Sequence, residues 1–213
     1  DRNRLNASAL IRLGGSILAL VAAIVLAPAT LGAELQFRHH FISRDLPVTK
    51  SGSGAYGLTA LADLNRDGRP DFVLGGRQPK LERLYWFEYR APDRWLQHEV
   101  GHDYQSDVGL AALDLDGDGW LDLVCSGVWY RNPAPPRDAP WQRFVFAEKA
   151  SGAHDVVVAD IDGDRRNDIV MMSDSRRPLN ALCWFKIPAD PRQPWERRHI
   201  GPGVHGAIAP AGI

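Results

Sequence analysis

The sequence predicts an all-β protein, a β-propeller of four-stranded antiparallel blades whose ring is incomplete. One observation is an Asp-rich loop that occurs three times, beginning at Asp63, Asp114 and Asp160. The loops start about 50 residues apart, and a repeat of that length indicates stacked supersecondary units. The other observation is that four short strands accompany each loop in the same order, which is the make-up of a propeller blade.

The four strand-like segments of each repeat can be read in order. An apolar segment precedes the loop: YGLTALAD, DVGLAALD and HDVVVAD. A second apolar segment follows it directly: DFVLGG, DLVCSG and DIVMMS. Then come an aromatic segment (RLYWFEY, GVWYRNP, ALCWFKIP) and a Trp-led segment (RWLQHEVG, PWQRFVFAE, PWERRHIG). Short runs rich in β-branched and aromatic residues, bounded by Gly, Pro and Asp, are strand signals.

The ends of the chain carry partial repeats. FRHHFI, residues 37–42, matches a fourth strand, and GVHGAIAPAGI, residues 203–213, matches a first strand with His205 at the place of His154. Three complete blades are fewer than the four to eight of a typical propeller. We therefore expect residues 34–213 to be a propeller truncated at its C-terminal end, with closure through self-association as the alternative.

The first 33 residues differ from the rest. Three Arg residues precede the apolar run SILALVAAIVLAPA, and small residues follow it. This order predicts a secretory signal peptide over residues 1–33. The expected location is secreted, periplasmic or at the cell surface, and an uncleaved segment would anchor the chain in a membrane. The formal net charge of −1 gives no basic field for nucleic acid.

The three loops share oxygen-bearing side chains at positions 1, 3, 5 and 9. These are Asp63, Asn65, Asp67 and Asp71; Asp114, Asp116, Asp118 and Asp122; Asp160, Asp162, Asp164 and Asp168. With the position-7 carbonyls of Arg69, Trp120 and Arg166, they form the hard donor set that Ca²⁺ prefers. Two carboxylates about 4 Å apart repel by roughly 4 kcal/mol at an effective dielectric near 20, so we expect Ca²⁺ at two to three sites. The alternative is a set of Asp turns closed by internal hydrogen bonds.

The residue at position 6 predicts which loop is the weakest calcium site. Gly68 and Gly119 permit a left-handed turn there, whereas the third loop has Arg165. The third loop is therefore expected to be the weakest calcium site. An EF-hand is excluded, because it needs flanking helices and a Glu at position 12, where this chain has Leu74, Cys125 and Met171.

The loops LNRDGRPDF, LDGDGWLDL and IDGDRRNDI, each between apolar strands, resemble FG-GAP/VCBS repeats. The resemblance covers residues 37–208 and implies a calcium-binding propeller like that of integrin α subunits and many secreted bacterial proteins. Such propellers serve in adhesion, in carbohydrate binding and as scaffolds of sugar lyases. HDVVVADIDGD and the Trp-led strands also resemble, more distantly, the propeller of aldos-2-ulose dehydratase-type enzymes.

Candidate catalytic residues lie where the first strand of each repeat begins. They are Asp107, His154, Asp155 and His205, with Tyr56 at the equivalent place. Such residues could act as acid and base on a sugar at a propeller channel, or simply line it. No nucleophile elbow, phosphate loop or H-E-x-x-H motif is present.

The leading functional hypothesis is an exported, calcium-stabilised propeller module that binds a glycan or a protein. One alternative is a sugar or polysaccharide lyase or dehydratase with its site at the propeller channel. Another is a structural repeat segment of a larger surface protein. Cys125 and Cys183 both lie in apolar strands and are expected to be buried free thiols, with a disulfide between them as the alternative.

Overall fold

The structure is a computed structural model. It describes residues 36–47, 56–77, 83–104, 108–136, 140–148, 150, 152–173, 179 and 181–202. The chain divides into two compact units, residues 1–39 and 40–213, and all strands belong to the second. No helix in the described part of the chain is long and apolar enough to cross a membrane.

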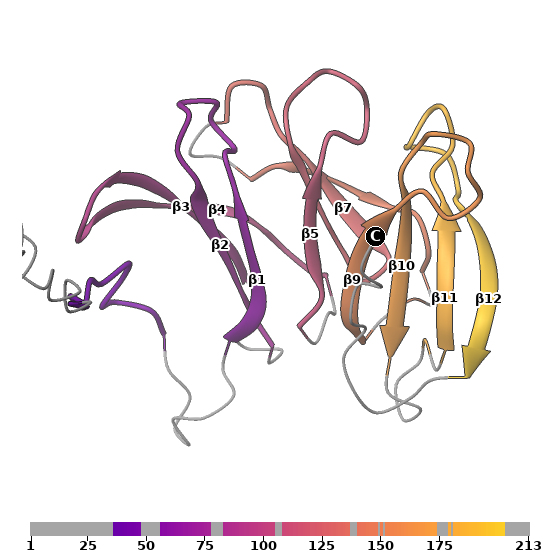
Figure 1. The fold of residues 1–213 in the computed structure, drawn as a ribbon, viewed down its shortest axis with the longest axis horizontal. Coiled ribbons are helices and arrows are strands. Elements are labelled where there is room, and N and C mark those ends of the chain that lie inside the picture. Colours follow the sequence, from indigo (N-terminus) through magenta and orange to yellow (C-terminus); the bar gives the residue numbers. More distant parts are fainter. Residues whose placement is uncertain are drawn as a thin grey trace, which may run out of the picture. The chain divides into compact units, whose positions relative to one another are not determined.

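The described residues form three four-stranded antiparallel sheets in which sequence neighbours pair (Figure 1). The first contains β1 (Tyr56–Ala62), β2 (Asp71–Gly76), β3 (Arg83–Ala91) and β4 (Arg94–His102). The second contains β5 (Leu110–Leu113), β6 (Asp122–Cys125), β7 (Val128–Arg131) and β8 (Gln142–Val145). The third contains β9 (Ala153–Ala159), β10 (Asp168–Ser173), β11 (Ala181–Lys186) and β12 (Glu196–Pro202). These are the blades that the repeat predicts, so the all-β, propeller-type architecture is confirmed.

The strand register is the same in all three sheets. The residue after each acidic loop pairs with an aromatic residue of the third strand: Phe72 with Phe87, Leu123 with Tyr130 and Ile169 with Phe185. The next pairs are Val73 with Trp86, Val124 with Trp129 and Val170 with Trp184. An aromatic residue on a half-buried pleated surface packs well against its cross-strand neighbour. The repeat in sequence is therefore a repeat in pairing.

Neighbouring sheets pack through two apolar clusters, and β6 contributes to both. Because successive side chains of a strand point to opposite faces, Leu123 and Cys125 join the cluster shared with the first sheet, and Val124 joins the cluster shared with the third. Both clusters combine aliphatic with large aromatic side chains; the aromatic ones include Trp86, Tyr130 and Trp141 in one cluster, and Trp129, Phe146, Phe185 and Trp195 in the other. A fully buried large apolar side chain contributes about 1.5–3 kcal/mol, so these clusters hold the blades together.

The sequence prediction is wrong for residues 37–42, which are not a strand; residues 36–47 carry no strand at all. Asp93, in the turn between β3 and β4, bonds this segment instead. Its Oδ1 accepts the Phe41 N–H (2.6 Å), and its Oδ2 lies 2.8 Å from His40 Nδ1. The signal peptide predicted for residues 1–33 and the partial blade predicted for 203–213 lie outside the described residues.

Candidate metal centres

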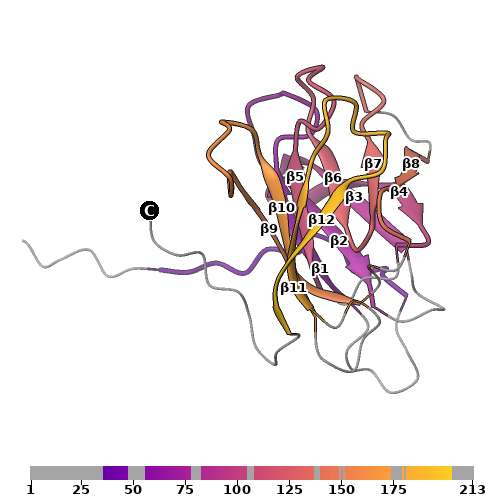
Figure 2. The ribbon, with the colours of Figure 1, turned by 90° about the vertical axis from the view of Figure 1, so that its right-hand side faces the viewer.

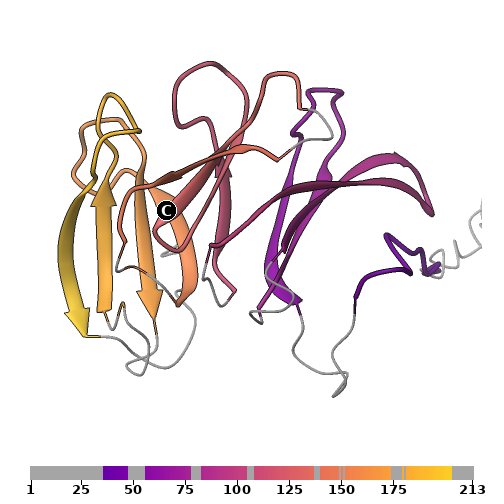
Figure 3. The same ribbon diagram turned by 180° about the vertical axis from the view of Figure 1, so that it is seen from behind.

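Each acidic loop connects the first two strands of its sheet: β1–β2, β5–β6 and β9–β10. In Figures 1, 2 and 3 the three loops stand at the same, upper end of the sheets. The loops occupy equivalent places because the strands that flank them share one register. The same chemistry is thus repeated three times at one end of the described blades.

The carboxylate of the first Asp in each loop accepts hydrogen bonds from backbone N–H groups further along the same loop. In the second loop the two carboxylate oxygens of Asp114 accept the N–H groups of Gly117 (2.8 Å) and Gly119 (2.9 Å). Asp160 makes the same bonds with Gly163 and Arg165. Asp63 does so with Asp67 and Gly68. The internal hydrogen bonds expected of Asp turns are therefore present in all three loops.

The last Asp of each loop ties the loop to the sheet. Asp122 is fully buried; its Oδ2 accepts the Leu115 N–H (3.1 Å) and its Oδ1 the Asn132 N–H (2.8 Å). Asp71 makes the matching bonds to Leu64 and Tyr89. Burial raises the pKa of Asp122 to about 7, because desolvation disfavours the charged form. A cation nearby would stabilise the ionised form of this carboxylate, so a bound metal would offset the cost of burying Asp122.

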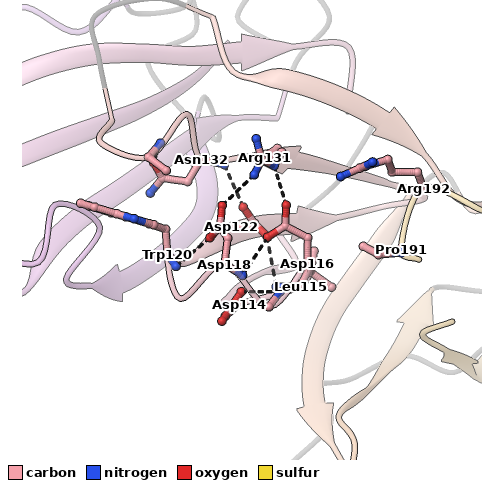
Figure 4. A network of polar contacts seen from close by, with 12 residues as sticks. Asp114, Leu115, Asp116, Asp118, Trp120, Asp122, Arg131, Asn132, Pro191 and Arg192 are labelled. Carbon is pink, nitrogen blue, oxygen red and sulfur yellow. Dashed lines mark hydrogen bonds and ion pairs between the residues drawn. The ribbon is translucent and has the colours of Figure 1, made fainter. Parts of the chain in front are cut away.

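In the second and third loops, the carboxylates at positions 3 and 5 lie beside the third strand of their sheet; Figure 4 shows the second loop. In the second loop Arg131 lies there: its Nε is 2.5 Å from Asp116 Oδ2, and a terminal nitrogen is 2.8 Å from Asp118 Oδ2. In the third loop the Lys186 ammonium is 2.5 Å from Asp162 Oδ2 and 2.8 Å from Asp164 Oδ2. The two carboxylates raise the pKa of Lys186 above its usual value. A cationic side chain thus bridges two of the predicted ligands in both loops.

The first loop has an acid in that place. Register aligns Glu88 with Arg131 and Lys186, since each follows the aromatic residue paired with the strand after the loop. The Asn65 amide donates to Glu88 Oε1 (2.9 Å) and lies 3.4 Å from Asp67 Oδ2. Arg90 and His98 also contact Glu88, at 2.7 and 3.1 Å. In the described part of the chain, no basic side chain forms an ion pair with Asp63 or Asp67.

Two groups of carboxylates are close enough to share one metal ion. Oxygens of Asp114, Asp116 and Asp118 lie within 4.8 Å of one another, and so do oxygens of Asp160, Asp162 and Asp168. Oxygen donors in such a group fit a hard divalent cation. In the first loop the carboxylates are joined by Asn65 and by Glu88, which the sequence analysis did not include among the ligands. The donor chemistry of the second and third loops therefore fits Ca²⁺, and in both loops a basic side chain contacts two of the acidic residues.

Left-handed backbone occurs at two positions of every loop. Position 6 has φ of 83° at Gly68, 86° at Gly119 and 69° at Arg165, as the sequence predicts. Position 4 has φ of 59° at Arg66 and 76° at both Gly117 and Gly163, which the sequence analysis missed. The first and third loops therefore each hold one non-glycine residue in this conformation, and position 6 alone does not separate them.

Polar contacts link the first loop to the second blade. The buried Asn132 amide donates to the Leu64 carbonyl (3.0 Å) and to the Leu121 carbonyl (3.1 Å). The Arg66 guanidinium donates to the Gly119 carbonyl and lies 4.7 Å from the Trp120 ring centroid. The first and second acidic loops are therefore in direct contact.

The other predicted residues do not gather into a described site. His154 and Asp155 lie on β9, with His154 Nδ1 3.1 Å from Asp155 Oδ2, while Asp107 and His205 lie outside the described residues. Tyr56 donates to the Pro47 carbonyl (2.8 Å). Cys125 and Cys183 are buried free thiols, as expected. Trp86, Tyr130 and Trp184 are buried core residues.

The functional residues that sequence reasoning missed are Glu88, Arg131, Lys186 and Asn132. A signal for the first three was present: they stand at one position of each repeat, directly after the aromatic pairs WF, WY and WF. Their contact with the loop depends on how the third strand pairs with the second, which the sequence alone did not supply.

Fold and site together define a class: an all-β protein of propeller-type repeats, each with an acidic loop between its first two strands. Within that class, residues 63–125 match the family model of the FG-GAP-like repeat. The resemblance noted in the sequence is thus confirmed for this segment, which runs from the first acidic loop to the end of β6. Comparisons with curated proteins and with solved structures found no match.

Proposed function

We propose that this chain is a calcium-binding propeller-type repeat module of an exported protein, and that it binds a glycan or a protein. The observation that carries the proposal is the recurrence of an acidic loop at one end of three blades, with carboxylate oxygens that converge in the second and third loops. Family likeness supports it, since FG-GAP repeats are generally calcium-binding. The basic start and apolar run of residues 1–33 support export.

The loop residues would divide the work of holding the ion. Positions 1, 3 and 5 offer carboxylate or amide oxygens, and the buried position-9 Asp fixes the loop against the sheet. A bound Ca²⁺ would neutralise the negative charge of the loop. Its contribution would be to stabilise the end of each blade, and so to maintain the conformation of the ligand-binding surface.

Calcium binding is tested by calorimetric titration of the full chain with CaCl₂, with MgCl₂ as the control. We expect binding of two to three equivalents of Ca²⁺. Between the second and third loops, Asp114→Ala is expected to reduce binding more than Asp160→Ala. The larger effect from Asp160→Ala would overturn that ranking, and no heat from CaCl₂ would overturn the calcium proposal.

A hollow of about 600 Å³ beside the first acidic loop supports the ligand-binding part of the proposal. It is lined by Leu61, Arg69, Tyr89 and Trp95 among others. The Trp95 and Tyr89 rings pack edge to face, with their centroids 4.9 Å apart. The side chain of Leu61 is 71% exposed. Aromatic faces with a guanidinium nearby suit the apolar face and hydroxyl groups of a sugar.

The ligand proposal is tested by screening immobilised oligosaccharides with the wild type and with Trp95→Ala. We expect the variant to lose binding while Leu96→Ala, a change at the neighbouring exposed residue, retains it. Binding that survives Trp95→Ala would place the ligand elsewhere. If no sugar binds, the proposal is restricted to a protein ligand.

The contact between His154 and Asp155 gives the lyase or dehydratase alternative its one structural support. Turnover of an oligosaccharide that disappears in His154→Ala would favour the enzyme. Absence of turnover by the full-length protein would remove it.

A further inference from the structure

The position that follows the aromatic pair of the third strand differs in charge between the three blades. It is Glu88 in the first, Arg131 in the second and Lys186 in the third. All three lie against the acidic loop of their own blade. Arg131 and Lys186 oppose the negative charge of their loops, whereas Glu88 is itself ion-paired with Arg90.

Arg131 binds the second loop at the point where a metal would gather its ligands. It spans Asp116 (2.5 Å) and Asp118 (2.8 Å) through two different nitrogens. Both carboxylates belong to the group of three whose oxygens lie within 4.8 Å. A guanidinium held in this fork geometry satisfies two carboxylates at once.

Lys186 does the same in the third loop with a single nitrogen. Its ammonium contacts Asp162 (2.5 Å) and Asp164 (2.8 Å). These are positions 3 and 5, the same pair that Arg131 contacts. Arg131 and Lys186 therefore occupy equivalent strand positions, and each contacts the carboxylates at positions 3 and 5 of its own loop.

We infer that Arg131 and Lys186 are built-in counter-ions of the second and third loops. These two loops then keep their conformation without a divalent ion, and an ion that binds there has to displace the basic side chain from the carboxylates at positions 3 and 5. The competition with a metal rests on the proposed calcium binding; the counter-ion role itself does not.

The counter-ion role is tested in the absence of metal. Thermal melts of the full chain in EDTA are compared for the wild type, Arg131→Met, Arg131→Lys and the control Arg83→Met. Arg83 forms an ion pair with Glu99 on the same face of a sheet but away from the acidic loops. We expect Arg131→Met to melt several degrees below the wild type (roughly 2–4 °C per kcal/mol for a chain of this size), with Arg131→Lys and Arg83→Met close to the wild type.

The conservative variant separates charge from packing. If Arg131→Lys melts as low as Arg131→Met, or if Arg131→Met melts with Arg83→Met, the counter-ion inference is overturned. If Arg131→Met does not fold in EDTA while Arg131→Lys does, the inference holds. Lys186→Met and Lys186→Arg repeat the comparison in the third loop.

Calcium then distinguishes the inference from the proposed function. We expect CaCl₂ to restore the melting temperature of Arg131→Met, and the affinity for Ca²⁺ in calorimetry to rise on the order of tenfold as the competing charge is removed. Loss of stability in EDTA that CaCl₂ does not restore would leave the counter-ion role standing and remove calcium binding at this loop. An unchanged affinity for Ca²⁺ in Arg131→Met would overturn the competition between Arg131 and the metal.

Discussion

Single residues determine whether an acidic loop can close. Positions 4 and 6 take up left-handed backbone in all three loops, and only the second loop has glycine at both, as Gly117 and Gly119. For residues with a Cβ this conformation costs roughly 1–2 kcal/mol. Arg66 and Arg165 both adopt this conformation. Contacts of Arg66 with Gly119 and Trp120 offset part of the cost in the first loop.

Gly117→Ala should destabilise the protein by about 1 kcal/mol through backbone conformation alone. A Cβ at Gly117 would meet no atom within 4 Å, so the substitution adds strain at a φ of 76° without a clash. Gly201→Ala is the matched control, because a Cβ there also meets nothing and its φ is not positive. Urea unfolding measures both, and equal effects would show that φ at Gly117 is not the cause.

Asp122→Asn should lower the free energy of unfolding by about 1–3 kcal/mol. Both carboxylate oxygens of the buried Asp122 accept backbone N–H groups, from Leu115 and Asn132. An amide keeps only one acceptor oxygen, so one of these N–H groups loses its partner. The exposed Asp45→Asn serves as the control in the same urea titration. A loss no larger than that of the control would contradict the role given to Asp122.

At the scale of the element, strands and loops were readable from sequence, but contacts between elements were not. The alternation of apolar residues and the Asp-rich loops place β1, β2 and their equivalents correctly. The contact of Arg131 or Lys186 with its loop could not be predicted, because it depends on which residues of the third strand face the loop. The strand expected at residues 37–42 does not form, because this segment pairs with none of the described strands and the Asp93 side chain accepts the Phe41 N–H.

Asn132→Ala tests how blades one and two are coupled. Its side-chain amide, fully buried, donates to carbonyls of Leu64 in one blade and Leu121 in its own. Removing it leaves buried acceptors unpaired, at a cost of about 1–3 kcal/mol. We expect faster hydrogen exchange in both acidic loops, whereas Gln142→Ala, at an exposed position on β8, should change neither. Exchange that accelerates in the second loop alone would argue against coupling.

At the scale of the whole molecule, the acidic loops and the packing between blades belong to one set of sheets. The two apolar clusters join the three sheets, and the acidic loops close one end of each sheet. We expect that opening a loop would expose the buried Asp that anchors it and destabilise the adjoining strands. The charge balance of the loops is therefore expected to affect the stability of all three blades.

Melting the full chain in EDTA and in excess CaCl₂ tests the central claim most directly. A ligand at about 100 times its dissociation constant stabilises the folded state by about 2.7 kcal/mol. For a chain of this size that corresponds to a rise in melting temperature of about 5–10 °C. The account predicts this rise with CaCl₂. The same melting temperature in CaCl₂ and in EDTA would contradict it.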